Sequence, residues 1–428
     1  MSIIVKAGRV GKRVIKKLLP APEPSISCSR RIERVCTQKR ICAMTFDDGP
    51  MNLAAAPDRF DGRALTEVLL DTLARHGARA TFDVIGDTSE NYPDEAGKPG
   101  SAAWGGIRFD HYPDIHRDEF GGALHNETMI RRMIAEGHEI SNHGYRHVLF
   151  GRKPFVYGKR IFLEDFDAVI SDLQRLHGLM EERYGYTLRL MRPPHYVDAV
   201  AGGFSAYDAC DVMGYQYMAA SFDGAGWLPS VQTDPERALQ AEIDAMTEPM
   251  RTLLEADPDA LCGQIIFQKD GYNMARRTPV AFGLDKQLEL LDRYGYRVVP
   301  VSELMEESCF ADLGRDDPLY EKMAGLARTH AVVYSDNRVR LDRVMSRGEL
   351  AMLLAPREES IVRRLEQLRR REKVASRCAG AMAWCAENGF AEAVGEEKAP
   401  LTALPGRGFA PVMGPLTRRA VYEAYLEE

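Results

Sequence analysis

Short apolar runs alternate with amphipathic segments between about residues 40 and 304. The apolar runs predict buried strands at 41–46, 80–85, 137–140, 188–191, 217–221, 265–268 and 297–300. Between them, apolar residues at helical spacing predict helices at 65–76, 129–136, 162–184, 206–213 and 285–294. This repeated strand-then-helix order predicts a parallel sheet, with enough units for a distorted (β/α) barrel of about seven strands.

The pattern changes after residue 306, where the chain predicts a small all-α domain. Two units share one order: a helix, a Gly- or Asp-rich turn, and a helix that starts at Ser346 or Thr417, both suited to an N-cap. Such units stack to bury their apolar faces. The charged stretch 358–373 between them predicts a solvated helix. The predicted domains are a basic leader and linker at 1–37, a barrel at 38–306 and helical repeats at 307–428.

A length of 428 residues exceeds one ordinary compact core, in agreement with two domains. The hydrophobic content of 45% and the charged content of 28% are typical of a globular protein, and the net charge of −7 gives no reason to expect nucleic-acid binding. No stretch is long and apolar enough to cross a membrane. The eight cysteines are scattered without a Cys-x-x-Cys pair, so we expect free thiols rather than a disulfide framework or a zinc ribbon.

The stretch 1–20 carries six basic and no acidic side chains among apolar ones. These charges interrupt the apolar run that a secretory signal needs. The stretch therefore predicts either a basic amphipathic helix in peripheral contact with an anionic membrane surface or a solvated leader. A linker rich in Pro and Ser follows at 20–29.

Two adjacent carboxylates, Asp47 and Asp48, follow the apolar run 41–44 and precede a Gly-Pro turn. Carboxylates this close repel each other, and one is driven toward protonation unless a cation lies beside them. The pair therefore indicates a metal site or a carboxylate held as a proton acceptor. A turn that caps the next helix is the alternative, because Asp and Gly-Pro are also ordinary turn residues.

His143 and His147 favour the metal interpretation. On a helical turn, residues at i and i+4 lie on one face with their β-carbons roughly 5–6 Å apart, so both imidazoles can bind one ion. Two histidines and a carboxylate, with positions left for water, are typical of a catalytic zinc site. The insertion at 87–125 is too long for a plain connection and predicts a functional loop over this site. Its ring-bearing side chains include Trp104, His111, Tyr112 and His116.

The stretch from about 40 to 304 resembles the polysaccharide deacetylases with a NodB-homology domain, carbohydrate esterase family 4. Residues 45–50, the His143–His147 pair, 192–194 and 222–227 match four of the five family motifs, the last with wider spacing than usual. The resemblance implies a barrel that hydrolyses the N-acetyl group of an amino sugar or polysaccharide of peptidoglycan or chitin type. It also implies a bound Zn²⁺, or another divalent cation such as Co²⁺, Ni²⁺ or Mn²⁺.

The resemblance assigns a role to each motif residue. The implied metal ligands are Asp48, His143 and His147. The implied catalytic residues are Asp47 as the base, Arg192, which holds the base in place, Asp223 and Lys269. The substrate-binding residues are His195, whose backbone N–H would face the developing oxyanion, Tyr196 and Trp227.

The fifth motif departs from the family pattern. The family usually has Leu-x-His-Asp, with a His that protonates the leaving amine, but Lys269 stands at that position in 265–271. A lysine is a poor general acid near neutral pH unless burial lowers its pKa. Three interpretations stay open. Lys269, paired with Asp223, donates the proton or stabilises charge as a cation; His195 or a histidine of the insertion supplies the proton; or the step is lost.

The C-terminal part resembles S-layer homology repeats, helical modules that dock bacterial proteins on cell-wall polymers. Residues 310–312, 346–349 and 417–420 carry the likeness. The resemblance implies a cell-wall polymer as a partner and a place in the bacterial cell envelope, whereas the lack of an evident signal peptide leaves the cytoplasm open as the alternative. A helical appendage that packs on the barrel is the alternative. The sequence gives no prediction of the oligomeric state.

The predicted function is therefore metal-dependent removal of N-acetyl groups from an N-acetylated glycan. One alternative is a catalytically impaired, metal-containing carbohydrate-binding protein, in which Lys269 marks the loss of catalysis. Another is a hydrolase of a different amide or imide. No acetate release with intact sugar binding favours the binding protein, and turnover of small amides without acetate release favours the other hydrolase.

Overall fold

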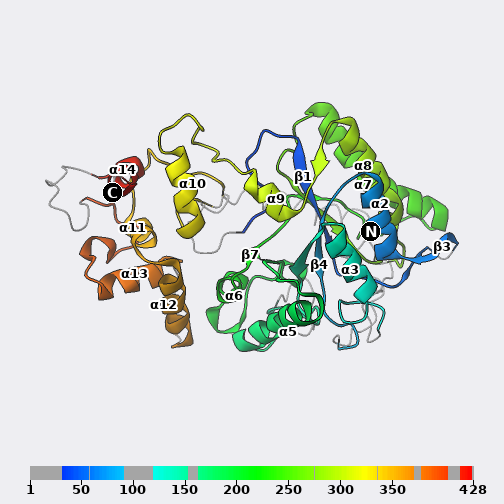
Figure 1. The fold of residues 1–428 in the computed structure, drawn as a ribbon, viewed down its shortest axis with the longest axis horizontal. Coiled ribbons are helices and arrows are strands. Elements are labelled where there is room, and N and C mark those ends of the chain that lie inside the picture. The colour runs from blue at the N-terminus through cyan, green and yellow to red at the C-terminus, as the bar shows by residue number, and fades with distance from the viewer. Residues whose placement is uncertain are drawn as a thin grey trace, which may run out of the picture.

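The computed structural model describes residues 31–56, 58–90, 119–152, 162–273, 275–334, 336–370, 377–402 and 415–426. Figure 1 shows a parallel sheet wrapped by helices, with a smaller, all-helical region beside it. The leader and the linker predicted before residue 30 lie outside the described residues. So do four side chains of the insertion, Trp104, His111, Tyr112 and His116.

In the part of the chain that the structure describes, eight parallel strands make up the main sheet, in the order β7-β6-β5-β4-β1-β9-β8, with β10 beside β1. The strands are β1 (Ile41–Asp47), β4 (Thr81–Val84), β5 (Glu139–Asn142), β6 (Leu190–Met191), β7 (Gln216–Tyr217), β8 (Phe222–Asp223), β9 (Ile265–Lys269) and β10 (Arg297–Val298). Every residue of β1 is buried, as expected for a central parallel strand. A separate antiparallel pair is formed by β2 (Ala54–Ala56) and β3 (Arg59–Ala64).

Helices follow the strands and cover the sheet (Figure 1). They are α2 (Leu65–Arg75), α3 (Glu127–Ala135), α5 (Phe166–Tyr184), α6 (Ala206–Met213), α7 (Pro235–Ala256), α8 (Pro279–Arg293) and α9 (Val301–Glu306). Their apolar faces form one core with the central strands, which includes Met44, Phe46 and Phe82. The predicted distorted (β/α) barrel with a small all-α C-terminal part is confirmed. Among the residues that the structure describes, no helix is long and apolar enough to cross a membrane.

Several local predictions differ from the observed elements. The apolar pattern does not reveal α7, a helix of 22 residues. The stretch 217–221 is not one strand, because the chain leaves β7 at Tyr217 and enters β8 only at Phe222. Helix α5 begins later than predicted, where the Asp165 carboxylate accepts the backbone N–H of Ala168 and so caps the helix. Helix α8 begins earlier than predicted, with a proline at its first position.

The chain just before β1 helps to close the barrel. Ile32 forms a bridge with Met218, beyond β7, and Arg34 forms one with Gln264, just before β9. Two backbone hydrogen bonds of 2.9 and 2.7 Å hold Ile32 in place. We refer to residues 31–36 as the strap, because they connect the β7 end of the sheet to β9 near the amino end of β1.

The helical region has an apolar core of its own, with buried side chains from positions 313 to 422. Its helices are α10 (Tyr320–Thr329), α11 (Arg347–Leu354), α12 (Arg357–Arg369), α13 (Ala379–Glu387) and α14 (Arg418–Leu426). Ser346 caps α11 in a capping box, and the Thr417 hydroxyl accepts the backbone N–H of Ala420 at the start of α14. Both predicted N-caps are therefore confirmed.

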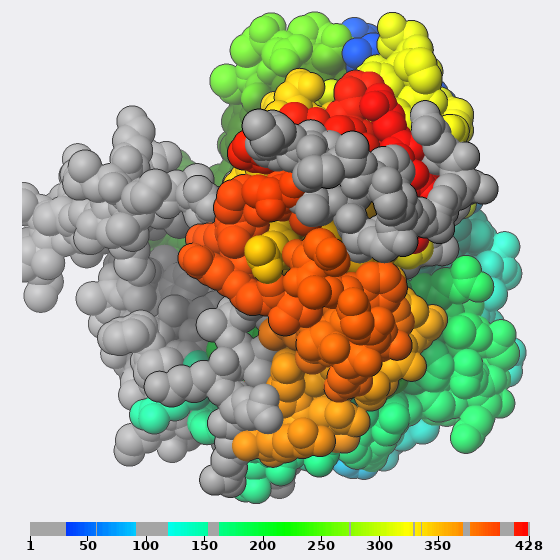
Figure 2. All heavy atoms as spheres, turned by 90° about the vertical axis from the view of Figure 1, so that its left-hand side faces the viewer, coloured from blue at the N-terminus to red at the C-terminus, as the bar shows by residue number. Residues whose placement is uncertain are grey.

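Helix α12 packs on the barrel, so the prediction of a solvated helix at 358–373 is wrong in part. Arg364 donates to Asp208 Oδ1 in α6 at 2.8 Å, and both side chains are buried. Leu368, one helical turn further on, is buried as well. Figure 2 shows the orange atoms of the helical region against green atoms of the barrel. This contact explains why an arginine within a charged stretch is not left to solvent.

His138 is a buried side chain that links two central strands. It lies just before β5, and its Nδ1 accepts the backbone N–H of Ala80, just before β4, at 3.0 Å. Its ring lies edge-on to Phe82. Burial lowers the pKa of His138 to about 4. The Glu136 carboxylate raises this pKa and the Arg132 charge lowers it, but burial has the largest effect. The neutral ring is the form that can accept this hydrogen bond.

We predict that His138 alone makes the free energy of unfolding fall by about 2 kcal/mol between pH 7 and pH 5. The unfolded chain binds a proton near the ordinary pKa of ~6.5, whereas the folded chain binds it only near pH 4. This stability is therefore present above pH 6.5 and is lost as the pH falls below it. Urea unfolding at both pH values measures the loss. In His138→Asn, whose amide oxygen can accept the same N–H, the difference should shrink by that amount, and an unchanged difference would contradict this role.

Candidate metal centre and active site

Three side chains predicted as metal ligands converge at the carboxyl ends of β1 and β5. Asp48 follows β1, His143 follows β5, and His147 comes from the loop that continues from His143. The Nε2 atoms of His143 and His147 lie 3.3 and 3.0 Å from one oxygen, Oδ1 of Asp48. All three residues are buried, and their ligand atoms lie within 4.8 Å of one another. The structure thus places the three around one point.

The two histidines do not lie on a helical turn, so that part of the prediction is wrong. The stretch 143–147 is a loop in which Gly144 and His147 have positive φ angles of 83° and 54°. The left-handed region is uncommon for a residue with a β-carbon and is often found at functional sites. Here it turns the chain back, so that the second imidazole reaches the same carboxylate as the first.

The backbone fixes the orientation of His143. Its Nδ1–H donates to the carbonyl oxygen of Arg192 at 2.8 Å, which directs Nε2 at Asp48. Ligating histidines usually donate their other ring N–H in this way. Burial opposes charge on the imidazole, but the Asp47 and Asp48 carboxylates outweigh it and raise the pKa of His143 to about 9. One carboxylate oxygen and two imidazole nitrogens around one point fit a divalent ion such as Zn²⁺.

A buried guanidinium holds the other aspartate, Asp47. Arg192 is fully buried, and its Nη1 donates to Asp47 Oδ1 and, at 2.9 Å, to Thr45 Oγ1. The same nitrogen lies 2.8 Å from Asp83 Oδ2 on the neighbouring strand. The second oxygen of Asp47 lies 3.8 Å from His143 Nε2. Asp47 is therefore fixed directly beside the ligand cluster.

Asp83 is a residue of this site that the sequence analysis misses. It lies fully buried in β4, level with Asp47 in β1. Burial raises the pKa of Asp83 to about 8, against the charge of Arg192 and with help from Asp47. A carboxyl group with this pKa is mostly protonated near neutral pH. The charge of the Arg192 guanidinium is then balanced mainly by the Asp47 carboxylate. The available signal is a single Asp inside a run predicted to be a buried strand.

Lys269 contacts the ligand cluster directly. It lies level with Asp47 in the pairing of β1 with β9, and its Nζ lies 2.8 Å from Asp48 Oδ2. Asp48 therefore holds the ammonium with one oxygen and faces both imidazoles with the other. Burial opposes charge on Asp48, but Lys269 and His147 hold the pKa of that carboxyl well below its usual range. One of the three interpretations pairs Lys269 with Asp223, whereas the structure shows an ion pair of Lys269 with Asp48.

His195 and Tyr196 follow Arg192 in a short 3-10 turn, η2 (Pro194–Tyr196), and both have positive φ angles, of 55° and 54°. The ring of His195 lies 5.4 Å from the ring of His147, and the guanidinium of Arg192 lies 5.5 Å from the ring centre of Tyr196. Burial lowers the pKa of His195 to about 4, so its ring is neutral near pH 7. The structure thus brings both residues to the site.

Asp223 and Trp227 are bound to each other at the exposed end of β8. The Asp223 carboxylate accepts the indole N–H of Trp227 at 3.1 Å and the backbone N–H of Ala225 at 2.9 Å. In the pairing of β8 with β9, Asp223 lies level with Phe267, two positions before Lys269. The carboxylate thus fixes the indole just beyond β8, the strand next to the one that carries Lys269.

Asp270 supports the turn that carries Asp48, a role that the sequence analysis also misses. Its backbone N–H donates to the Asp47 carbonyl at 2.8 Å, and its carboxylate accepts the Thr66 hydroxyl at 2.8 Å. A β-carbon on Gly49 would lie only 2.0 Å from Asp270 Oδ2. The turn after Asp48 therefore needs a residue without a side chain.

Comparison with known proteins agrees with this geometry. Residues 34–197 match the family model described as polysaccharide deacetylase, and this span contains both aspartates, both histidines and Arg192. This part of the barrel is similar to polysaccharide deacetylase domains. Such domains belong to a family of hydrolases that act on the amide bonds of peptidoglycan- or chitin-type glycans.

Two curated relatives match part of this chain. The peptidoglycan-N-acetylmuramic acid deacetylase PdaC of Bacillus subtilis is 26% identical over 174 residues, 41% of this chain and 25% of that protein. The peptidoglycan-N-acetylglucosamine deacetylase PgdA of Listeria monocytogenes is 23% identical over 189 residues, 44% of this chain and 27% of that protein. The chain thus spans about a quarter of the length of these relatives. Among solved structures, a chitin deacetylase from Colletotrichum lindemuthianum matches with a TM-score of 0.42 and 21% identity, over 65% of this chain and 92% of that one.

We predict that Gly49→Ala lowers the free energy of unfolding of the barrel by about 1–3 kcal/mol, because the added methyl group overlaps the Asp270 carboxylate. Gly178→Ala is the matched control, since Gly178 lies in α5 and a β-carbon there meets no atom within 4 Å. That change should be neutral or stabilise by up to about 1 kcal/mol. Urea unfolding of both variants checks this, and equal stability of Gly49→Ala and the wild type would contradict the proposed fit.

Proposed function

We propose that the deacetylase domain is a divalent-metal-dependent hydrolase that removes the N-acetyl group from an amino sugar of a peptidoglycan- or chitin-type glycan. The observation that carries this proposal is the position of Asp47. One of its oxygens is held by Arg192, and the other lies 3.8 Å from His143 Nε2 at the edge of the ligand cluster. The names of the two curated relatives support an N-acetylated sugar of peptidoglycan as the substrate.

Asp48, His143 and His147 would hold the metal, with Zn²⁺ as the first candidate and Co²⁺, Ni²⁺ and Mn²⁺ as others. A divalent ion there would supply Lewis-acid activation of a water molecule and of the acetamide carbonyl. Three protein ligands, rather than four, are typical of catalytic zinc sites.

Asp47 acts as the base that takes a proton from the attacking water. Arg192 keeps this carboxylate in a fixed orientation, and Thr45 accepts a hydrogen bond from the same guanidinium nitrogen. Because its pKa is raised, Asp83 is mostly uncharged near neutral pH and competes little with Asp47 for the Arg192 guanidinium. These groups are in position before the substrate binds, so little reorganisation accompanies the reaction.

The turn after Arg192 and the end of β8 bind the sugar in this proposal. The backbone N–H of His195 donates to the developing oxyanion, and the rings of Tyr196 and Trp227 pack against the sugar or the acetyl methyl group. Because the Asp223 carboxylate accepts the indole N–H, we assign Asp223 to positioning Trp227.

We predict that Asp48→Asn weakens Zn²⁺ binding by at least about 100-fold and abolishes acetate release at the same Zn²⁺ concentration, because the charged ligand is lost. Asp259→Asn, which removes an exposed carboxylate paired with Arg40, is the matched control and should change neither. Calorimetric Zn²⁺ titration and acetate release from N-acetylglucosamine oligomers and peptidoglycan measure the two effects. Normal deacetylation by Asp48→Asn would refute the proposal. Turnover of small amides or imides by the wild type without acetate release would instead favour the other hydrolase.

The contact of Lys269 with Asp48 favours a second candidate, a metal-containing carbohydrate-binding protein with impaired catalysis. An ammonium on a ligand carboxylate repels a divalent ion at the same carboxylate. An ammonium held by a carboxylate also releases its proton less readily than a free one, which makes it a poor donor to the departing amine. In the first candidate Lys269 delivers this proton, and in the second the step is lost.

Substitutions of Lys269 separate the two candidates. If Lys269 delivers the proton, Lys269→Met should lower acetate release by ~10²–10⁴-fold. The same variant should bind Zn²⁺ more tightly, because the competing cation is gone. Lys269→Arg keeps the charge and is the matched control for Zn²⁺ affinity, which it should leave near the wild-type value. A Lys269→His variant that releases acetate faster than the wild type would contradict the first candidate and support the second.

We also propose that the helical region binds a cell-wall polymer and that the protein acts in the cell envelope. The two capped units that begin at Ser346 and Thr417 support this assignment. Co-sedimentation with purified cell walls and cell fractionation test it. A chain that stays in the supernatant and in the cytosolic fraction would contradict it.

A further inference from the structure

Two half-buried cysteines, Cys36 and Cys309, meet although they are 273 positions apart in the chain. Their Sγ atoms lie 3.6 Å apart, and Cys309 Sγ donates to the Cys36 carbonyl oxygen at 3.0 Å. The backbone N–H of Cys309 donates to the same carbonyl at 2.7 Å. Backbone and side-chain contacts thus both hold the two residues side by side. The sequence predicts free thiols, because nothing in the spacing of the cysteines singles out this pair.

The pair lies where the barrel meets the start of the helical region. Cys36 ends the strap, and Cys309 follows α9 in the segment that leads to α10. Lys39 and Glu307 form an ion pair between the same two segments. The strap also accepts a hydrogen bond at 3.3 Å from the Asn337 side chain of the helical region. A covalent bond here would therefore reinforce an existing contact.

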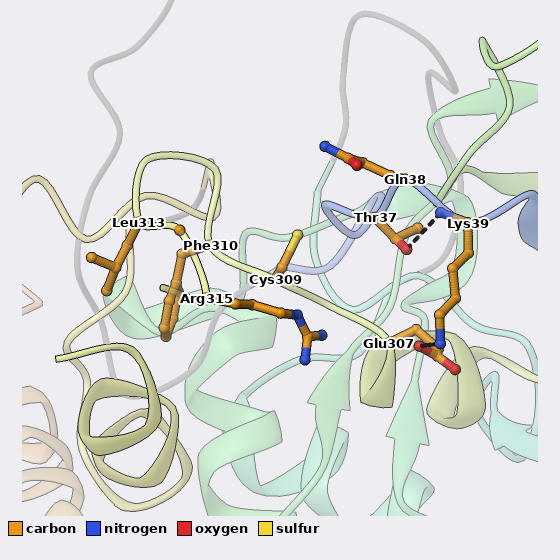
Figure 3. A pocket seen from close by; sticks show the side chains of 9 residues that line it. Thr37, Gln38, Lys39, Glu307, Cys309, Phe310, Leu313 and Arg315 are labelled. Atoms are coloured by element: carbon orange, nitrogen blue, oxygen red, sulfur yellow. Dashed lines mark hydrogen bonds and ion pairs between the residues drawn. The ribbon is translucent and has the colours of Figure 1, made fainter. Parts of the chain in front are cut away.

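A cavity of about 440 Å³ opens beside Cys309. Figure 3 shows Cys309 between Phe310 on one side and Thr37 on the other, with the cationic side chains of Lys39 and Arg315 nearby. A cavity of this size admits a small organic group, and its lining, with the Lys39 and Arg315 cations and the Glu307 carboxylate, has a net positive charge that favours an anionic one. Oxidised glutathione, an anionic oxidant of the disulfide class, would approach the Cys309 sulfur through this cavity.

We propose that Cys36 and Cys309 form a disulfide bond that ties the barrel to the helical region. The sulfurs must approach by about 1.5 Å to reach disulfide length, which rotation of the side chains provides. One cysteine thiolate attacks the small disulfide and releases one small thiol. The other thiolate then attacks the mixed disulfide and releases the second small thiol. Two protein thiols are oxidised to one disulfide, and one small disulfide is reduced to two thiols.

The disulfide acts on stability and not on the reaction. Cys36 precedes the amino end of β1, whereas Asp47 and Asp48 lie at its carboxyl end, roughly 20 Å away along a strand of this length. The bond closes a loop of more than half the chain, and long loops give the largest restriction of the unfolded state. The pair stays reduced in a reducing compartment and forms the disulfide in an oxidising one.

Treatment of the reduced full-length chain with oxidised glutathione, without denaturant, tests the proposal. We expect the intact mass to fall by two hydrogen atoms and the non-reduced digest to contain a peptide pair that joins Cys36 to Cys309. The midpoint of thermal unfolding should lie ~5 °C above that of the reduced chain. Cys309→Ser should lose both effects. Cys262→Ser is the matched control and should keep both, because Cys262 is also half-buried but contacts the Tyr296 hydroxyl.

Three results would overturn the proposal. An unchanged mass would show that the thiols are not oxidised, and persistent glutathione adducts would show that the second cysteine cannot resolve the mixed disulfide. A cross-link between other cysteines would show that this pair is not the preferred one. A Cys36–Cys309 cross-link without a rise in the unfolding temperature would overturn its stabilising role.

Discussion

The buried guanidinium of Arg192 is the constraint on which the candidate site depends. Its Nη1 donates to Asp47 and Thr45 and lies 2.8 Å from Asp83 Oδ2. Its backbone carbonyl accepts the ring N–H of His143. An uncompensated buried charge costs several kcal/mol. Arg192 therefore cannot be replaced by a neutral residue without leaving the Asp47 carboxylate unpaired. One residue thus fixes the proposed base through its side chain and a proposed metal ligand through its backbone, and it ties together β1, β4 and the loops after β5 and β6.

The balance of charge around Arg192 explains why Lys269 matters. Metal ligation requires both imidazoles to be neutral, and Asp83 is mostly protonated near neutral pH. The Asp47 and Asp48 carboxylates are then balanced by Arg192 and Lys269, so a divalent ion would enter a cluster with no net charge. A neutral side chain in place of Lys269 would leave one net negative charge for the ion. The lysine would therefore weaken the proposed metal binding electrostatically while it keeps Asp48 ionised.

The strand ends that carry the ligands could be predicted because each polar side chain follows an apolar run, and the carboxyl ends of parallel strands share one edge. The loop conformation between His143 and His147 could not be predicted. A loop with left-handed residues and a helical turn can both bring the two imidazoles to one carboxylate. Asp83, Asp270 and the partner of Lys269 depend on which strands are neighbours and on their register. Spacing along one sequence does not encode that register. The same holds for Arg364, whose partner on the barrel makes a charged stretch pack instead of facing solvent.

The candidate site and the contact of the strap with the helical region lie at opposite ends of β1. The carboxyl end carries Asp47 and Asp48, and β9 pairs with β1 at five successive positions that end at Lys269. The amino end receives the strap, where Cys36 meets Cys309. Every residue of β1 between these ends is buried, so the strand holds its two ends at a fixed separation. A covalent bond at the strap can therefore stiffen the scaffold without altering the charge balance at Asp48, and a substitution at Lys269 can alter that balance without loosening the scaffold.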